Sequence, residues 1–142
     1  MTKNNEPSLD NVLKLTYCSL DKCKKELEKI DTLKYESYMK LAVLFNKAEL
    51  TKMPKDKYQK ETKKIVNEIN NHKDNIKFIK CKIKNCNDNI RNVLLITISN
   101  ALNVRKDKKS KVMLNHYQNL FKQPIIKYKD AIKFYNDLDL IS

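Results

Sequence analysis

Glycine and tryptophan are absent from the 142 residues, and there are only three prolines. Glycine supplies the positive-φ positions of tight hairpins and the backbone of phosphate-binding loops. Its absence argues against a sheet-rich fold, a Rossmann fingerprint and a P-loop. With Pro7, Pro54 and Pro124 as the only strong helix breakers, the sequence predicts an all-α fold of a few long helices.

Arginine is also scarce, although the chain is strongly basic. Lys and Arg number 30 against 17 Asp and Glu, a net charge of +13, but only Arg91 and Arg105 are arginine. A basic balance is typical of proteins that bind nucleic acid or an anionic surface. Lysine lacks the planar fork with which arginine makes bidentate contacts to phosphate and guanine. Abundant lysine, asparagine and isoleucine are also expected from an AT-rich genome, so charge alone does not select a nucleic-acid binder.

The sequence shows no targeting or membrane segment. Residues 1–7 are polar and lack the apolar stretch of a signal peptide. The longest apolar run, 93–104, is short and contains Thr97, Ser99, Asn100 and Asn103. We therefore expect a flexible N-terminus over 1–7, no transmembrane segment, and a cytoplasmic or virion location.

Two long helical patterns are joined at the central proline. In the first, apolar or small residues alternate at spacings of three and four, as in a heptad seam: Leu13, Thr16, Leu20, Cys23, Leu27 and Ile30. Beyond Ile30 this pattern broadens to Leu33, Tyr38, Leu41, Ala42, Phe45 and Ala48. The second pattern keeps the same spacings from Tyr58 to Val93. We predict a long antiparallel hairpin over 8–104 with its turn near 51–57, a basic loop over 105–111 and a C-terminal helical segment over 112–142.

Four cysteines lie on the two patterns, as Cys18 with Cys23 and Cys81 with Cys86. In an antiparallel hairpin the position numbers of facing residues have a constant sum. The two seams match at a sum of 109 or 110, which places Cys23 opposite Cys86. A rival sum of 104 pairs Cys18 with Cys86 and Cys23 with Cys81. Cys23–Cys86 is the predicted disulfide, with two reduced core thiols as the alternative; Cys18 and Cys81 form a second thiol pair.

Metal binding and catalysis find little support in the sequence. A cysteine-rich metal-binding helical protein is one alternative, but helices with these cysteine phases do not converge four thiolates on one zinc ion. His72 lies on the seam of the second pattern, and neither His72 nor His116 belongs to a metalloprotease motif. No glycine-rich phosphate loop or nucleophile elbow occurs. We expect a non-enzymatic protein with no metal and no cofactor.

Two kinds of binding surface are predicted. Exposed tyrosines are favoured at protein interfaces, and the interface candidates are Tyr35, Tyr38, Tyr117, Tyr128 and Tyr135. A nucleic-acid surface would contact phosphate without reading base sequence. Its candidates follow the second helix and the basic loop: Lys73, Lys77, Lys80, Lys84, Arg91, Arg105, Lys106, Lys108, Lys109 and Lys111.

Long helical hairpins present extended faces that suit bridging between subunits. We therefore predict a structural or adaptor component that binds other protein subunits of a larger assembly, with homo-oligomerisation left open. The composition suits a minor capsid or virion protein of a large DNA virus. The alternative is a basic helical protein that binds nucleic acid independently of sequence.

Overall fold

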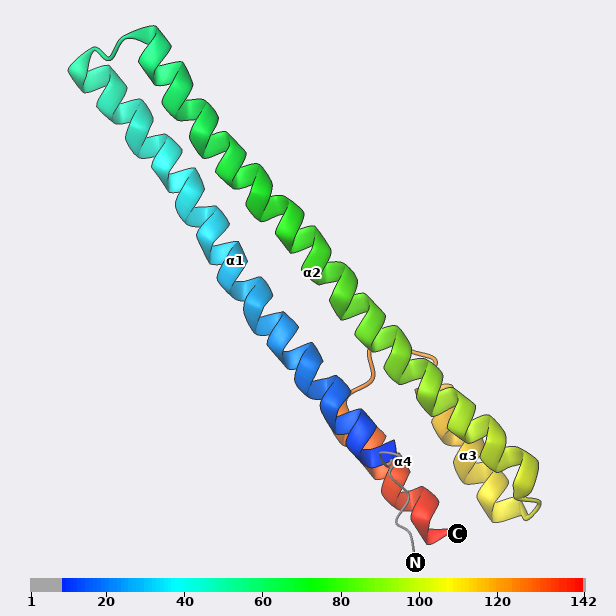
Figure 1. The fold of residues 1–142 in the computed structure, drawn as a ribbon. Helices are drawn as coiled ribbons and strands as arrows, with labels where there is room; N and C mark the ends of the chain where they lie inside the picture. The colour runs from blue at the N-terminus through cyan, green and yellow to red at the C-terminus, as the bar shows by residue number, and fades with distance from the viewer. Residues whose placement is uncertain (1–8, 142) are drawn as a thin grey trace, which may run out of the picture. The chain divides into compact units, whose positions relative to one another are not determined.

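A computed structural model of the chain describes residues 9–141. The predicted flexible N-terminus, 1–7, lies outside the described residues. The described part of the chain forms four helices, α1 (Leu9–Thr51), α2 (Lys55–Val104), α3 (Lys108–Leu120) and α4 (Tyr128–Leu140), and no strand (Figure 1). The all-α prediction is confirmed: α1 and α2 are long helices packed together as an antiparallel hairpin, and shorter helices follow.

The chain divides into two compact units, and the division cuts both long helices. The hairpin unit comprises Lys22–Lys82, with most of α1 and the first half of α2. Within the described residues, the bundle unit comprises 9–21 and 83–141, with the start of α1, the rest of α2, α3 and α4.

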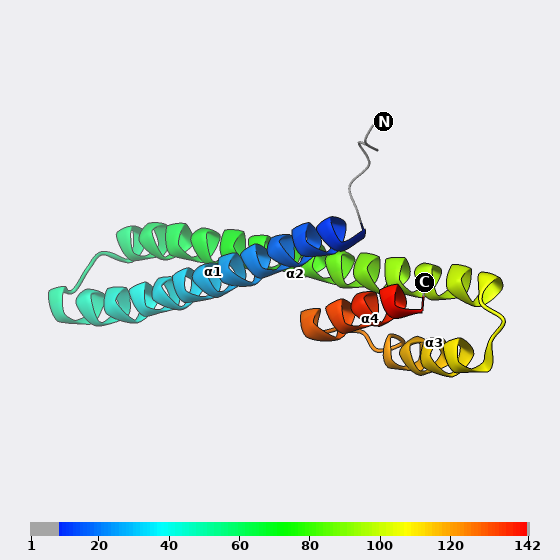
Figure 2. The ribbon, with the colours of Figure 1, turned by 90° about the horizontal axis from the view of Figure 1, so that it is seen from below.

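In the hairpin unit, α1 and α2 run side by side in both ribbon views (Figures 1 and 2). Two cross-helix contacts fix their register. Lys40 Nζ lies 3.1 Å from Glu68 Oε1, and Lys73 Nζ lies 5.8 Å from the centroid of the Tyr38 ring. The position sums of these pairs, 108 and 111, lie on either side of the predicted 109 or 110 and away from the rival 104.

The α1 seam of the hairpin unit differs from the predicted pattern beyond Ile30. The structure continues the spacings of three and four through Lys34, Ser37, Leu41, Leu44 and Ala48, all of which are buried or half-buried. Leu33, Tyr38, Ala42 and Phe45, which the sequence analysis placed on the packed side, are exposed. A heptad seam that continues along both helices keeps one face of α1 towards α2, so two polar residues enter the seam and several apolar residues are left outside it.

The hairpin turn is made without glycine. Lys52 has φ of 49°, in the left-handed region, directly after the end of α1. The N–H of Met53 donates to the carbonyl of Ala48 at 3.1 Å, the bond that joins the second residue after a helix to its last turn in a Schellman motif. The turn lies within the predicted 51–57 segment, and it places a lysine where glycine is usual.

Replacement of Lys52 by glycine should stabilise the hairpin unit. A left-handed conformation disfavours a residue with Cβ by roughly 1 kcal/mol, and glycine is free of this penalty. We expect Lys52→Gly to raise the free energy of unfolding by about 1 kcal/mol, measured by urea titration with circular dichroism. Lys47→Gly is the matched control, because Lys47 is an exposed residue in the interior of α1. This variant should lower the free energy of unfolding by about 1 kcal/mol. A loss of stability in both variants would contradict this account of the turn.

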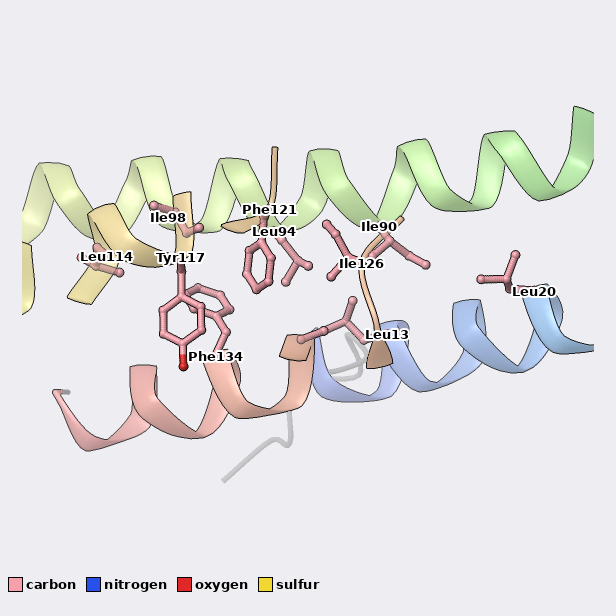
Figure 3. Close-up of a cluster of buried hydrophobic side chains, with 11 residues drawn as sticks. Leu13, Leu20, Ile90, Leu94, Ile98, Leu114, Tyr117, Phe121, Ile126 and Phe134 are labelled. Atoms are coloured by element: carbon pink, nitrogen blue, oxygen red, sulfur yellow. The ribbon is translucent and has the colours of Figure 1, made fainter. Parts of the chain in front are cut away.

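The main core lies in the bundle unit. Its buried side chains come from the start of α1, the second half of α2, α3, the segment after α3 and α4: Leu13, Leu20, Ile90, Leu94, Ile98, Leu114, Tyr117, Phe121, Ile126, Ala131 and Phe134. Figure 3 shows Ile90, Leu94 and Ile98 along one face of α2, directed towards α1 and towards the aromatic rings of the C-terminal region. Phe134 packs edge-on against Tyr117 and Phe121, with centroids 5.0 and 5.5 Å away.

Two predictions about the C-terminal region need correction. The predicted basic loop, 105–111, is a short connection because α3 already begins at Lys108. Asp107 is the N-cap: its Oδ2 accepts a hydrogen bond from the backbone N–H of Ser110 at 2.9 Å, which lowers the pKa of Asp107. The C-terminal helical segment therefore starts before residue 112, and it consists of two helices separated by 121–127.

The half-buried Tyr17 determines how the bundle unit responds to alkaline pH. Tyr17 Oη donates to the carbonyl of Ile126 at 2.7 Å. Burial, with contributions from the charge of Asp130 and from Tyr128, raises the pKa of Tyr17 from its ordinary value of 10.0 to about 12. The folded state therefore favours the neutral phenol. This stabilisation is complete below pH 10 and is lost as pH rises from 10 to about 12.

We expect the unfolding free energy of the wild-type chain to fall across this window more steeply than that of Tyr17→Phe, because phenylalanine removes the titrating group. Urea titrations at a series of alkaline pH values measure both slopes, and the shared lysine titration cancels in the comparison. Equal slopes would contradict the burial of the Tyr17 hydroxyl.

Candidate protein and nucleic-acid binding surfaces

The side of α1 that faces away from α2 carries an apolar stripe in the hairpin unit. Its members are spaced by four, four and seven residues, which places them on one side of a helix with 3.6 residues per turn. We define the α1 stripe as Tyr35, Met39, Val43 and Leu50, whose exposed fractions are 65, 50, 63 and 86%. The α1 helix carries seven of the nine large apolar side chains that are exposed in this unit.

A shallow depression lies beside the α1 stripe. Its apolar lining is Met39, Val43 and Leu44, and its charged lining is Glu36, Lys40 and Lys47. Lys40 is already held by Glu68 of α2, whereas Lys47 is exposed beside the apolar surface. The α1 stripe and the depression beside it thus offer apolar surface that a partner could bury, with the cation of Lys47 at its edge. Only Tyr35 of this stripe was predicted as an interface residue from the sequence; the helical spacing of Met39, Val43 and Leu50 is the signal that could have identified the others.

The predicted lysines of α2 are exposed. Lys73, Lys77 and Lys80 lie in the hairpin unit, separated by four and three residues, and form the α2 lysine row. None of the three forms an ion pair with another described residue. Lys84 is exposed in the bundle unit.

The remaining predicted cations do not form one exposed surface. Arg91 is half-buried and its Nη2 lies 2.8 Å from Asp88 Oδ1, so its charge is already matched. Arg105 is half-buried after the end of α2. The others follow the short connection and the first turns of α3, where they are exposed: Lys106, Lys108, Lys109 and Lys111.

The predicted interface tyrosines fall into different environments. Tyr35 and Tyr38 are exposed in the hairpin unit. Tyr128 is 39% exposed and packs edge-on against Tyr17, while Tyr135 is half-buried. The interpretation of Tyr117 as a surface residue is wrong, because it is 3% exposed.

Tyr117 belongs to the core of the bundle unit. Its hydroxyl donates to Asp137 Oδ2, which satisfies the polar end of the ring. Burial, followed by this hydrogen bond and the nearby carboxylates Asp137 and Asp130, raises the pKa of Tyr117 above its ordinary range. A tyrosine can be buried in this way only where a polar partner reaches its hydroxyl.

The four cysteines are free thiols in the structure. Cys18 and Cys81 are exposed, and Cys23 and Cys86 are half-buried. The predicted Cys23–Cys86 disulfide is not formed, and Cys18 and Cys81 are not paired either. Cys23 and Cys86 are thus reduced and half-buried, which corresponds to the alternative prediction of two reduced thiols.

Other chemistry has no evident centre in the described part of the chain. Over residues 9–141, no cluster of three or more His, Cys, Asp and Glu side chains is placed to hold a metal ion. A second shallow depression, in the bundle unit, is lined by Lys14, Tyr17, Cys18, Asp21 and Tyr128. None of the helices in the described range has the length and apolar character needed to cross a bilayer.

Comparison with known proteins gives no family and no function for the chain. The chain matches no protein-family model, no curated protein and no solved structure.

Proposed function

We propose that the protein is a non-enzymatic structural or adaptor component that binds a helix of another protein on the α1 stripe. The observation that supports this proposal is the exposure of Tyr35, Met39, Val43 and Leu50 on one side of α1. A two-helix unit has a single internal seam, and α1 carries a second apolar face that its partner α2 does not cover. Contiguous exposed apolar surface of this kind marks protein-binding sites.

The partner is an amphipathic helix with apolar side chains at spacings of three and four and acidic side chains beside them. Its apolar residues would pack on the ridge of Met39, Val43 and Leu50, as helices pack in bundles. Lys47 at the edge favours an acidic flank. The hairpin unit contains 17 lysines and nine acidic residues, a net charge of +8. Like charge disfavours a second copy of this chain as the occupant.

The wider setting of this proposal is a large assembly of protein subunits. A minor capsid or virion protein of a large DNA virus is the concrete form of the proposal, and its support is the lysine-, asparagine- and isoleucine-rich composition. The docking surface itself does not depend on that setting.

Site-specific photo-cross-linking in the native cell tests the proposal. A benzophenone amino acid replaces Val43 in the full chain, and the matched control places it at Gln59, an exposed polar position of α2 in the same unit. We expect one protein to be cross-linked from position 43 and not from position 59. Leu50→Asp, introduced into the chain that carries the benzophenone at position 43, should lower the yield of this cross-link at least tenfold. The substitution places a charge on the apolar α1 stripe.

Three outcomes would overturn the proposal: equal cross-linking from both positions, a yield unaffected by Leu50→Asp, or a partner whose linked segment is not an acidic amphipathic helix. A second copy of this chain as the linked species would replace the proposed partner by self-association. Circular dichroism of Leu50→Asp, which changes a residue that is 86% exposed, establishes that a lost cross-link does not reflect unfolding.

A further inference from the structure

We infer that the α2 lysine row, together with Tyr38, binds the backbone and bases of single-stranded nucleic acid without reading sequence. This activity goes beyond the proposed adaptor role and uses other residues of the hairpin unit. The inference depends on three features: cations that are not neutralised, their regular placement on one side of α2, and an exposed aromatic ring beside them.

The α2 lysine row differs from a second lysine row of the same helix in its acidic neighbours. On a helix, residues three and four apart are surface neighbours. Among those neighbours of Lys73, Lys77 and Lys80 the only acidic residue is Asp74. A second row, Lys57, Lys60 and Lys64, has the same pair of spacings in reverse order and the same exposure. Its neighbours at three and four residues include three acids: Asp56, Glu61 and Glu68.

This difference makes the α2 lysine row a local source of positive potential. At 1.5 Å rise per residue the row spans roughly 10 Å along the helix, which brings several phosphates of one strand within reach. Exposed lysines that have no ion-pair partner can neutralise phosphates and release their counterions, which is the main source of sequence-independent affinity. Lysine is suited to this role because it acts as a point charge with no requirement for bidentate geometry.

Tyr38 favours a single strand over a duplex. Its side chain comes from α1, is 42% exposed, and is held next to the row by the contact of its ring with Lys73 Nζ. Unpaired bases stack on aromatic rings in proteins that bind single strands, and the adjacent cations hold the phosphates. In a duplex the bases are already paired and stacked on one another, so no base is free to stack on the ring of Tyr38.

An anionic membrane is a weaker fit for the same cations. Membrane-surface helices combine cations with a broad apolar face that enters the lipid. On α2 between Lys73 and Lys82 the single exposed large apolar residue is Phe78, and Lys82 Nζ lies 4.8 Å from the centroid of its ring. The lysine row therefore lies on a polar side of the helix.

Fluorescence anisotropy with labelled oligothymidylate of about 20 nucleotides tests the inference on the full chain. The test variant is Lys73→Gln with Lys77→Gln and Lys80→Gln. The matched control is Lys57→Gln with Lys60→Gln and Lys64→Gln, which removes the same charge from the same helix. We expect the test variant to weaken binding at least tenfold at about 50 mM NaCl and to reduce the slope of log K against log salt by about 2.

The control variant should change affinity less than threefold, with a slope close to that of the wild type. Tyr38→Leu should weaken single-strand binding about fivefold and leave binding of a duplex of the same length unchanged. Equal losses in the two lysine variants would overturn the inference, because they would show that net charge alone attracts the oligonucleotide. The inference would also be overturned if the protein did not bind oligothymidylate. It would be overturned too if the α2 lysine row were needed for binding to phosphatidylserine vesicles but not for binding to the oligonucleotide.

Discussion

Phe134→Ala should destabilise the bundle unit by about 4 kcal/mol. The ring is 0% exposed and packs edge-on against Tyr117 and Phe121. Truncation removes the apolar contacts of a whole ring and leaves a cavity that α3, α4 and the second half of α2 can fill only in part. Because folded domains are stable by only about 5–15 kcal/mol, a loss of this size is a large share of the total.

Amide hydrogen exchange in α3 and α4 measures this loss within the bundle unit itself. Val112→Ala is the matched control, since Val112 lies in α3 of the same unit, is 63% exposed, and its truncation should cost less than about 1 kcal/mol. Similar losses for the two variants would contradict the placement of Phe134 in the core.

Leu44→Ala should destabilise the hairpin unit by about 2 kcal/mol or more. Leu44 is 6% exposed on the α1 seam, while the adjacent Val43 is 63% exposed on the α1 stripe. Val43→Ala is therefore a control at the next residue of the same helix, and it should change stability by no more than about 0.5 kcal/mol.

Hydrogen exchange over the end of α1 reports the opening free energy in both variants. The pair distinguishes the two apolar faces of α1: the seam contributes to stability, and the stripe is available for binding. A larger loss from Val43→Ala than from Leu44→Ala would mean that the two faces are exchanged, and it would remove the basis of the proposed docking surface.

The hairpin could be predicted because its signals agree. The spacings of three and four in both helices, the central proline and the matching sum of 109 or 110 each point to the same antiparallel pair. The contact between Lys40 and Glu68 has the register that these signals require within the hairpin unit. Long, regular helices with one break leave few alternatives for a sequence without glycine.

The faces of α1 beyond Ile30 could not be assigned in the same way. Leu33, Tyr38 and Phe45 are more apolar than Lys34 and Ser37, yet the polar pair occupies the seam. The choice depends on the geometry of the partner helix, because continued pairing keeps one face inward whatever residues it carries. Ser37 satisfies its buried hydroxyl by donating to the carbonyl of Leu33 at 3.1 Å, a bond that a serine inside a helix can make to the residue four positions earlier.

The errors in the C-terminal region have different physical origins. Asp107 with Ser110 was a readable N-cap signal inside the segment interpreted as a loop, since aspartate commonly begins a helix. The burial of Tyr117 depends on Asp137, twenty residues later, whose approach follows only from the packing of α3 against α4. The lysines of α2 were identified from sequence, but their freedom from ion pairs required the structure.

The register of α1 against α2 decides which residues of the two helices lie side by side, Tyr38 and Lys73 among them, and zero-length carbodiimide cross-linking tests it directly. The reagent joins an amine to a carboxylate that are in contact, and Lys40 Nζ lies 3.1 Å from Glu68 Oε1. In monomeric full-length protein, peptide mass spectrometry should find Glu68 linked to Lys40. Glu68 linked instead to Lys47 or Lys34 would mean a shift of about one heptad, which keeps the same helix faces inward but separates Tyr38 from Lys73, and the proposed single-strand site would then be wrong.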